Sequence, residues 1–369
     1  MRFNDIKRFK NIVIIFLLLL FMIISFWIRI LPSASFSYND YLCLKSPDVW
    51  YNFRLIELAI YHFPQFPSFD PMTSFPIGKS VDWGPLTTII CASIAIIFNK
   101  TTRPDFMSIV AFIGPIIAII LVPIVFLLGK AFWDTWAGLI ASLFVSVGTF
   151  SLYYRTSYGL VDHHGFEILL SSAFILVYIT SIHFIEKHPI SYNNIHTLIR
   201  PLFLAGLAGF VYMLGLLNMP TFILFGFIIA IFTLFAFPFY KFAKKSTDCL
   251  IFLNIIIFII AIIVLLFFIG LKTSGMIIYF YSLGQLLCYI FFILETVALW
   301  SIEKYYKFYF KYILLLVGFL IFSFFLLSEF VFNIQTIGFD LINKQQMVGT
   351  IGELRSTDIT TLLFSYNFG

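Results

Sequence analysis

The sequence has few charged residues for its length. Only 11% of its 369 residues are Asp, Glu, Lys or Arg, whereas 61% are hydrophobic. Soluble globular domains carry roughly 25% charged and about 45–50% apolar residues. The shortage of charge therefore excludes an ordinary soluble domain and predicts a protein that uses the lipid bilayer as its solvent.

Cysteine is also scarce, and its positions exclude two kinds of site. The four cysteines are Cys43, Cys91, Cys249 and Cys288, which are far apart and form no Cys-x-x-Cys pair. Neither a disulfide framework nor a thiolate zinc site is indicated. The net charge is only +5, and the basic residues stand in short loops between apolar runs, as in membrane proteins. A nucleic-acid partner is therefore not expected.

Long apolar runs fill most of the chain. About 20 helical residues cross the hydrocarbon core of a bilayer, and nine runs reach or approach that length. They are Asn11–Leu31, Phe106–Leu128, Trp136–Tyr154, Phe166–Ile185, Pro201–Leu217, Thr221–Tyr240, Leu250–Gly270, Met276–Leu299 and Ile313–Phe332. A further run, Pro85–Phe98, has only about 14 residues, which favours an interfacial helix. The predicted fold class is an all-α polytopic membrane protein with about nine helices before its last outer loop.

The basic residues predict the orientation of these helices. The first run is preceded by Arg2, Lys7, Arg8 and Lys10, so we expect a cytoplasmic N-terminus and a retained first helix. With nine spans, the cytoplasmic loops then carry Lys130, Lys187, Arg200, Lys241, Lys244, Lys245, Lys304, Lys307 and Lys311. Three polar segments share the opposite, outer face: a first loop at 32–105 with interfacial helices, the break before Phe166, and a last loop at 333–360.

These three segments hold residues that suggest metal chemistry. Asp48 lies in the first segment. Asp162 and His164 lie in "VDHHGFE" of the second, and Glu353 lies in "TIGE" of the third. Two or three carboxylates with one imidazole suit Mg²⁺ or Mn²⁺. In a tight turn, the Asp-x-His spacing lets two side chains converge on one ion, while we expect the intervening His163 to point elsewhere.

Other ionisable residues near these segments have less specific patterns. Arg155, at the end of the helix before Asp162, is expected to brace the carboxylates or to bind a phosphate through two hydrogen bonds. Glu167 and Glu329, near helix ends, are expected to be solvated. Taken singly, Asp48, Glu353 or the Asp-His-His turn also fits a plain solvated loop or an interfacial cap.

Four motifs in series favour a specific family. Four segments resemble successive signatures of the catalytic subunit of oligosaccharyltransferase, in their order along the chain and in their predicted side of the membrane. They are "SPDVWYNFRLIE", "FPIGKSVDWGPL", "YRTSYGLVDHHGFE" and "TIGE". The resemblance is to the archaeal and bacterial single-subunit form, a GT-C glycosyltransferase, and the Asp-x-His motif is similar to the archaeal variety. It spans residues 1–369 but only the N-terminal membrane part of such an enzyme.

The resemblance implies a reaction and roles for individual residues. An oligosaccharide would be transferred from a polyprenyl phosphate or diphosphate to Asn in Asn-x-Ser/Thr of an acceptor polypeptide, on the extracytoplasmic face of the membrane. Asp48, Asp162 and His164 would bind Mn²⁺ or Mg²⁺, and Arg155 would support that cluster. Asp48 would also contact the acceptor asparagine amide, and Glu353 would reach that amide or the metal.

Part of the family pattern has no counterpart in the sequence. Members of the family continue into a soluble domain with a Trp-Trp-Asp motif that holds the acceptor Ser or Thr, and no such motif occurs here. We therefore expect residues 1–369 to form the N-terminal part of the transmembrane catalytic domain without the C-terminal soluble domain. A fragment, a split enzyme with a separate C-terminal half, and a truncated product all fit this expectation.

Three other interpretations stay open. A related polyprenyl-phosphate-sugar transferase of GT-C fold would share the acidic first loop, but would not need Asp-x-His and TIGE together. A catalytically silent remnant would keep the motifs without the activity. A transporter would be expected to place ionisable groups near mid-membrane and to contain inverted repeats, whereas here the ionisable groups gather at the helix ends.

Overall fold

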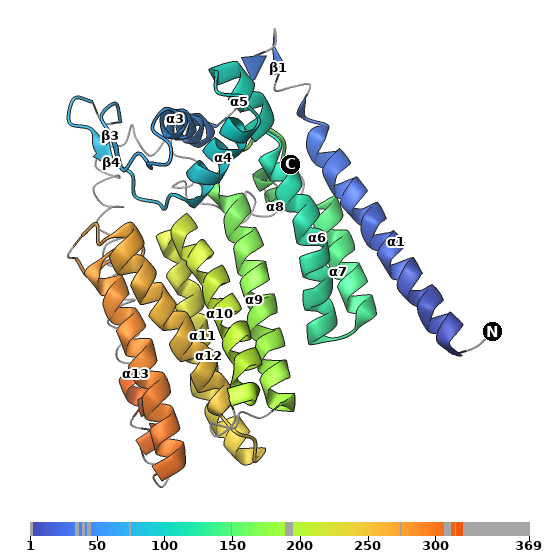
Figure 1. The fold of residues 1–369 in the computed structure, drawn as a ribbon, viewed down its shortest axis with the longest axis vertical. Coiled ribbons are helices and arrows are strands. Elements are labelled where there is room, and N and C mark those ends of the chain that lie inside the picture. Colours follow the sequence, from blue (N-terminus) through green and yellow to red (C-terminus); the bar gives the residue numbers. More distant parts are fainter. Residues whose placement is uncertain are drawn as a thin grey trace, which may run out of the picture. The chain divides into compact units, whose positions relative to one another are not determined.

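The structure is a computed structural model that describes residues 3–33, 37–38, 41–42, 46–73, 75–148, 150–188, 195–273, 275–305, 311–313 and 315–319. The chain divides into two compact units, which we describe one at a time. The first comprises Met1–Thr180 with Leu217–Met219, and the second comprises Ser181–Leu216 with Pro220–Gly369. Helices dominate both units (Figure 1), so the predicted all-α membrane fold class is confirmed.

Within the described residues, seven segments are long and apolar enough to span a membrane. They are Arg8–Ile30, Arg103–Phe132, His163–Lys187, His196–Asn218, Pro220–Phe242, Asp248–Ile269 and Leu283–Lys304. Each overlaps one predicted span. The predicted ninth span, Ile313–Phe332, lies largely outside the described residues.

The predicted third span, Trp136–Tyr154, is wrong as a single helix. The helix α7 (Thr135–Val147) ends at Gly148, whose φ of 81° is a left-handed conformation that glycine adopts without strain. A short helix, α8 (Phe150–Arg155), follows. Because the two pieces are separate, neither has the length of a full span.

The first unit begins with α1 (Phe3–Ile30) and then forms the predicted first outer loop. This loop contains β1 (Ser37–Tyr38), β2 (Tyr41–Leu42), α3 (Pro47–Tyr61), β3 (Phe69–Asp70), β4 (Lys79–Ser80), α4 (Leu86–Ile97) and the start of α5 (Arg103–Val110). Each strand pair is an antiparallel hairpin. The short apolar run Pro85–Phe98 forms α4, whose 12 residues are too few to span a bilayer.

A buried carboxylate holds the second hairpin against α3. Asp70 is fully buried and accepts hydrogen bonds from Arg54 at 2.7 Å, Thr73 at 2.6 Å and the Met72 N–H at 3.0 Å. Burial alone would raise the pKa of Asp70, but the hydrogen bonds from Thr73 and Met72 and the charge of Arg54 lower it. These contacts therefore tie the described residues of α3 to those of the second hairpin.

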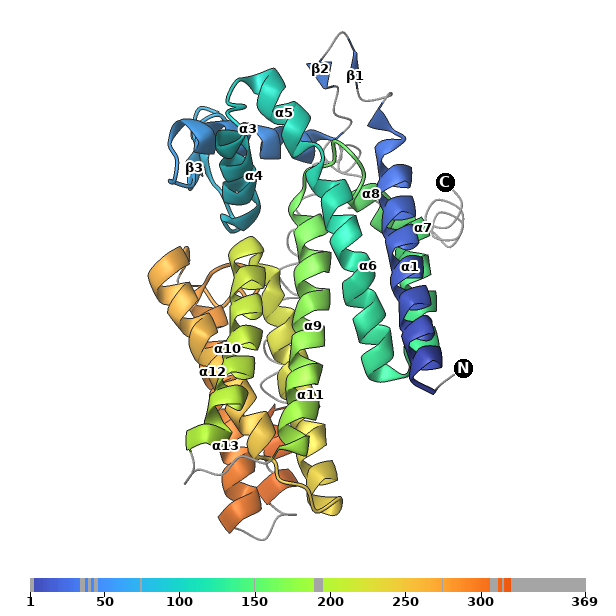
Figure 2. The same ribbon diagram turned by 45° about the vertical axis from the view of Figure 1, so that its right-hand side comes forward.

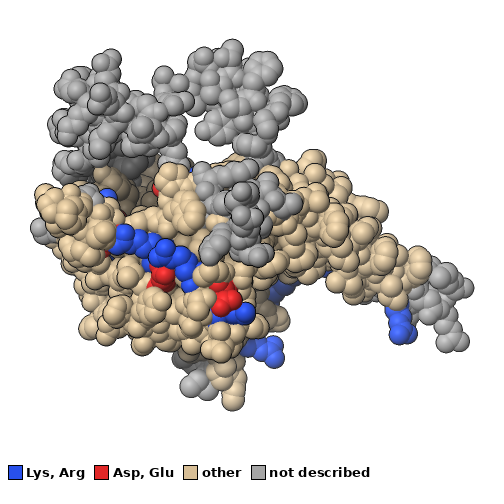
Figure 3. Space-filling model, turned by 90° about the horizontal axis from the view of Figure 1, so that it is seen from above, with Lys and Arg blue, Asp and Glu red and all other residues tan. Residues whose placement is uncertain are grey.

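A group of Lys and Arg side chains with a few Asp and Glu side chains lies on the face shown in Figure 3, which otherwise consists mostly of other residues. In the first loop they pair: Lys100 lies 3.2 Å from Asp105, and Lys79 lies 3.1 Å from Asp82. Exposed pairs of this kind contribute little to stability, because water and salt screen them. Charged groups avoid hydrocarbon, so these pairs indicate which part of the first unit faces water.

The apolar helices of the first unit include α1, α6 (Ile113–Phe132), the shorter α7 and the first part of α9 (His163–Lys187). The helices α1, α6 and α7 pack against one another (Figure 2). Glycines let α6 and α7 approach closely: a Cβ at Gly138 would lie 2.5 Å from the Phe126 carbonyl oxygen, and one at Gly129 would lie 2.7 Å from the Gly138 Cα. Small residues at such contacts are typical of membrane helix pairs.

The second unit is a helical bundle with an aromatic core. It contains the end of α9, most of α10 (Ile195–Asn218), the 3₁₀ turn η1 (Pro220–Phe222), α11 (Ile223–Phe242), α12 (Asp248–Ile263), the π-helical η2 (Val264–Ile269) and α13 (Leu283–Tyr305). The hydroxyls of Tyr212 and Tyr289 lie 3.1 Å apart in this core. Asn254 donates to the Thr233 hydroxyl at 2.7 Å, so polar groups inside the bundle satisfy one another.

One residue departs from the expectation that ionisable groups gather at helix ends. Glu295 lies in the middle of α13 and is only 3% exposed. Among the described residues, none hydrogen-bonds its carboxyl oxygens. The sequence pattern therefore describes most of the ionisable groups correctly but not this one.

Candidate functional site

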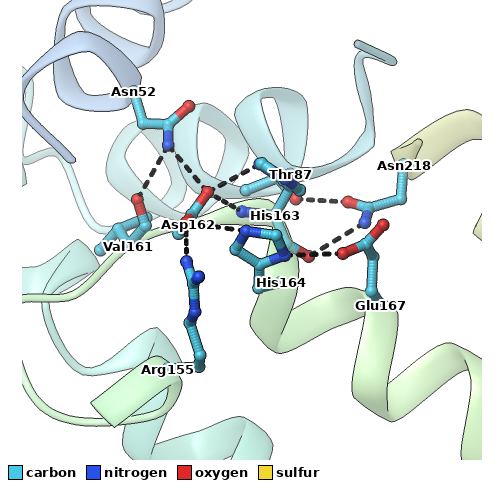
Figure 4. Close-up of polar contacts among 9 residues, drawn as sticks. All are labelled: Asn52, Thr87, Arg155, Val161, Asp162, His163, His164, Glu167 and Asn218. Atoms are coloured by element: carbon cyan, nitrogen blue, oxygen red, sulfur yellow. Dashed lines mark hydrogen bonds and ion pairs between the residues drawn. The ribbon is translucent and has the colours of Figure 1, made fainter. Parts of the chain in front are cut away.

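The break between α8 and α9 forms a compact polar cluster in the first unit (Figure 4). The helix α8 ends at Arg155, and α9 begins at His163. Asp162 is thus the residue immediately before a helix, and its Oδ1 accepts the backbone N–H of His163 at 2.7 Å. The free N–H groups and the partial positive charge of a helix N-terminus stabilise an anion at this position.

Side chains from two other helices, α8 and α3, also contact the Asp162 carboxylate. Arg155 Nη1 lies 3.1 Å from Oδ2, and Asn52 of α3 donates to Oδ1 at 3.3 Å and to the Val161 carbonyl at 3.2 Å. The Asp162 side chain is only 9% exposed. Burial alone would raise its pKa, but the close nitrogens of His163 and His164 lower it well below its ordinary value. The carboxylate is therefore ionised at neutral pH.

His164 has the geometry of a metal-binding histidine. Its Nδ1 lies 2.8 Å from Glu167 Oε2, and its Nε2 lies 3.7 Å from Asp162 Oδ2. A carboxylate that accepts the Nδ1–H fixes the tautomer and leaves the Nε2 lone pair for a cation. The expectation that Glu167 is simply solvated is wrong, because three residues along a helix bring it beside His164.

The expectation that His163 points elsewhere is also wrong. Its Nδ1 lies 2.7 Å from Asp162 Oδ1, and its ring stacks on Trp83 with centroids 6.0 Å apart and contacts the His164 ring at 4.1 Å. The Nδ1 atom is buried, and the Asp162 carboxylate is its nearest charged partner. His163 therefore lies within the polar cluster rather than outside it.

Together these residues form a group that can hold a metal ion. Within the described part of the chain, Asp162, His163 and His164 are the group of three whose ligand atoms all lie within 4.8 Å of one another. One carboxylate and two imidazoles, with no thiolate, match the donors found in non-haem transition-metal sites. The structure thus places a second imidazole, that of His163, beside the predicted ligands Asp162 and His164.

Asn218 braces the cluster from the end of α10. It is almost fully buried. Its Nδ2 donates to the His163 carbonyl at 3.0 Å, and its Oδ1 accepts the Thr87 hydroxyl of α4 at 2.6 Å. Its own carbonyl accepts the N–H of Gly84 at 3.1 Å. No sequence signal pointed to Asn218, because its partners are far away along the chain.

The other two predicted site residues lie outside this group. Asp48 is exposed in the first turn of α3. It stands one helical turn before Asn52, so both residues share the helix face from which Asn52 reaches Asp162. Glu353 and the rest of the segment 333–360 lie outside the described residues. The roles of Asp48 and Glu353 therefore stay predictions.

Comparison with known proteins gives a consistent family match. The family model "Oligosaccharyl transferase STT3, N-terminal" matches residues 12–362. Dolichyl-phosphooligosaccharide-protein glycotransferase 3 of Archaeoglobus fulgidus is 26% identical over 305 residues, which cover 82% of this chain and 34% of the relative. Dolichyl-monophosphooligosaccharide–protein glycotransferase AglB of Haloferax volcanii is 22% identical, over 52% of this chain and 19% of the relative. The chain thus spans about a third or less of the length of these relatives.

Solved structures of the Archaeoglobus fulgidus oligosaccharyltransferase share the fold. The apo form has a TM-score of 0.74 at 27% identity, over 80% of this chain and 34% of that one. The complex with an inhibitory peptide and a dolichol-phosphate has a TM-score of 0.77 at 24% identity, over 89% and 39%. The complex with Zn and sulfate has a TM-score of 0.74 at 24% identity, over 85% and 40%.

The Asn218 bridge can be tested by a double-mutant cycle. Asn218→Leu should lower the free energy of unfolding by about 1–3 kcal/mol, because it strands buried polar groups. Thr87→Val removes the same hydrogen bond with little change of shape. Since the two residues share one bond, the double variant should lose less than the sum of the single losses. The free energy of unfolding is measured in detergent for the two single variants and the double variant. Thr180→Val, at an exposed position, is the control. Strict additivity would show that the bridge does not hold the site together.

Proposed function

The chain belongs to the STT3 family of oligosaccharyl transferases, whose N-terminal region it matches, and we propose that it supplies the cation site of an N-glycosylation enzyme. In this proposal an oligosaccharide passes from a polyprenyl phosphate or diphosphate to Asn in Asn-x-Ser/Thr. The observation that carries the proposal is the buried Asp162 carboxylate beside His164, with the His164 Nδ1 held by Glu167. The homology to glycotransferases of two archaea supports it.

We assign the cation site to Asp162 and His164, with His163 beside them, and propose Asp48 of α3 as a further ligand. Carboxylates suit both Mg²⁺ and Mn²⁺, whereas Mg²⁺ strongly prefers oxygen ligands. The imidazoles therefore favour Mn²⁺ of the two predicted metals. A similar archaeal structure was obtained as a complex with Zn and sulfate. A bound divalent cation would neutralise the charge that develops on the phosphate leaving group.

The protein groups around the cluster suit a phosphate-bearing donor. Arg155 places a guanidinium 3.1 Å from Asp162, which adds positive charge beside the site, and an arginine fork binds phosphate oxygens well. The oligosaccharyltransferase AglB of Archaeoglobus fulgidus is known in a complex with an inhibitory peptide and a dolichol-phosphate. By analogy we propose a lipid-linked donor and an acceptor polypeptide as the partners of this chain.

The acceptor needs groups beyond the described cluster. An amide nitrogen is a weak nucleophile, so carboxylates must accept its protons or its hydrogen bonds. We propose that Asp48 and Glu353 fill this role. Recognition of the acceptor Ser or Thr would come from a C-terminal portion, since the chain spans about a third of the length of its Archaeoglobus relative.

A reconstituted transfer assay tests the function. Combined with the C-terminal portion of the Archaeoglobus relative, the chain should glycosylate an Asn-x-Thr peptide from a lipid-linked oligosaccharide, whereas residues 1–369 alone should not exceed background. Asp162→Asn keeps the side-chain shape but removes the charge, so transfer should fall by about 100-fold or more. Asp105→Asn, on the exposed surface of α5, is the matched control and should retain activity.

Two results of this assay would contradict the proposal. Equal transfer by the wild-type chain and by Asp162→Asn would remove the cation site from the mechanism. No transfer with any C-terminal portion, in a chain that still binds Mn²⁺, would favour a catalytically silent remnant.

The proposed outer location of the site is tested by thiol labelling. Ile77, between β3 and β4, and Trp133, between α6 and α7, are 84% and 85% exposed, and both belong to the first unit. In a Cys43→Ser background, an impermeant reagent applied to intact cells should label Ile77→Cys. It should label Trp133→Cys only after the membrane is permeabilised, because the cytoplasmic end of α6 carries Lys130. The reverse pattern would place the Asp162 cluster on the cytoplasmic face.

A further inference from the structure

A fully buried arginine lies at the end of α1. Arg29 is 0% exposed although it belongs to a segment that is apolar enough to span a membrane. A guanidinium in such a place is costly unless each of its donors has a partner, and it marks a functional region by default. The partners of Arg29 therefore show what the residue is for.

Two of these partners belong to the broken end of α7. Arg29 Nη1 donates to the Ser146 carbonyl at 2.9 Å, and Nη2 donates to the Val145 carbonyl at 3.0 Å. The last carbonyls of a helix have no partner within the helix, and a positive charge there is favourable. A Cβ at Gly148 would lie 3.4 Å from Nη2. Arg29 thus caps α7 at the point where the predicted third span breaks.

Two further contacts reach the loop that leads to the candidate cation site. Arg29 Nε donates to the Thr156 hydroxyl at 2.7 Å, and the Arg29 carbonyl accepts the N–H of Tyr158 at 3.0 Å. Thr156 follows Arg155 directly, and Arg155 contacts Asp162. The backbone around Thr156 therefore connects α1 with the Asp162 carboxylate.

The remaining contacts lie within α1. Arg29 Nη1 donates to the carbonyl and to the hydroxyl of Ser25, at 3.1 and 2.9 Å. These two hydrogen bonds satisfy Nη1 within α1 and do not involve the loop between α8 and α9. Ser25 is therefore a suitable control position, since it contacts Arg29 within α1 and these contacts do not involve the loop that carries Thr156.

We propose that Arg29 is a positioning residue for the cation site. Its rigid fork ties the end of α7 and the hydroxyl of Thr156 to α1, and so fixes the turn that carries Arg155 and Asp162. Lysine cannot replace it, because an ammonium group cannot span these acceptors with the same planar geometry. The inference rests on the cation site of the proposed function, but it concerns binding of the ion and not glycosyl transfer.

The test compares Mn²⁺ affinity with stability in the full chain purified in detergent. Thr156→Val keeps the shape of the side chain but removes the acceptor for Nε, and should weaken Mn²⁺ binding about tenfold. Thr156→Ser keeps the hydroxyl and should bind Mn²⁺ like the wild-type chain. Ser25→Ala should lower the unfolding temperature without changing the affinity. Titrations are made far below the unfolding temperature of every variant.

Arg29→Lys should lose Mn²⁺ affinity as Thr156→Val does, provided that it folds. If it does not fold, the comparison of Thr156→Val with Thr156→Ser still tests the proposal. A Thr156→Val chain that is less stable but binds Mn²⁺ normally would overturn the proposal, because Arg29 would then serve stability alone. Equal losses of affinity in Ser25→Ala and Thr156→Val would overturn it as well. A wild-type chain that binds no Mn²⁺ would instead refute the cation site itself, and this inference with it.

Discussion

The candidate site depends on one buried carboxylate, that of Asp162. Burial of an ionised group is costly unless opposite charge and hydrogen bonds compensate it. Here the compensation comes from separate elements: the N-terminus of α9, Arg155 at the end of α8, and Asn52 of α3. Because these partners must meet at one point, the carboxylate fixes how these helix ends converge in the first unit.

Part of this arrangement could be predicted from the sequence alone. Hydropathy gives the helical membrane fold, since only helices and closed barrels satisfy their backbone in lipid. The Asp-x-His spacing correctly brings Asp162 and His164 together at one turn. The series of motifs led to the family that the comparisons show. The roles of Asp48 and Glu353 came from the same resemblance and stay predictions.

The remaining features depend on contacts that sequence patterns do not encode. Hydropathy cannot detect that Gly148 breaks the run Trp136–Tyr154 into two helices, because apolar residues continue on both sides. Glu167 looked like a helix-end residue until its contact with His164 was seen. Asn218 hydrogen-bonds Thr87, and Arg29 hydrogen-bonds Thr156, and each pair is more than a hundred residues apart along the chain. Such residues carry no local signature, although they determine where the ligand atoms lie.

The proposed cation site makes His164, oriented by Glu167, and Asp162 the ligands of a divalent ion. Pulsed electron paramagnetic resonance of Mn²⁺ bound to the chain labelled with ¹⁵N-histidine tests it most directly, because it detects histidine nitrogens coordinated to the ion. We expect a ¹⁵N coupling in the wild-type chain that is lost in His164→Ala. In His163→Ala the coupling should persist, even if Mn²⁺ binds more weakly. A Mn²⁺ signal without histidine coupling, or a coupling that survives in His164→Ala, would show that His164 does not bind the ion.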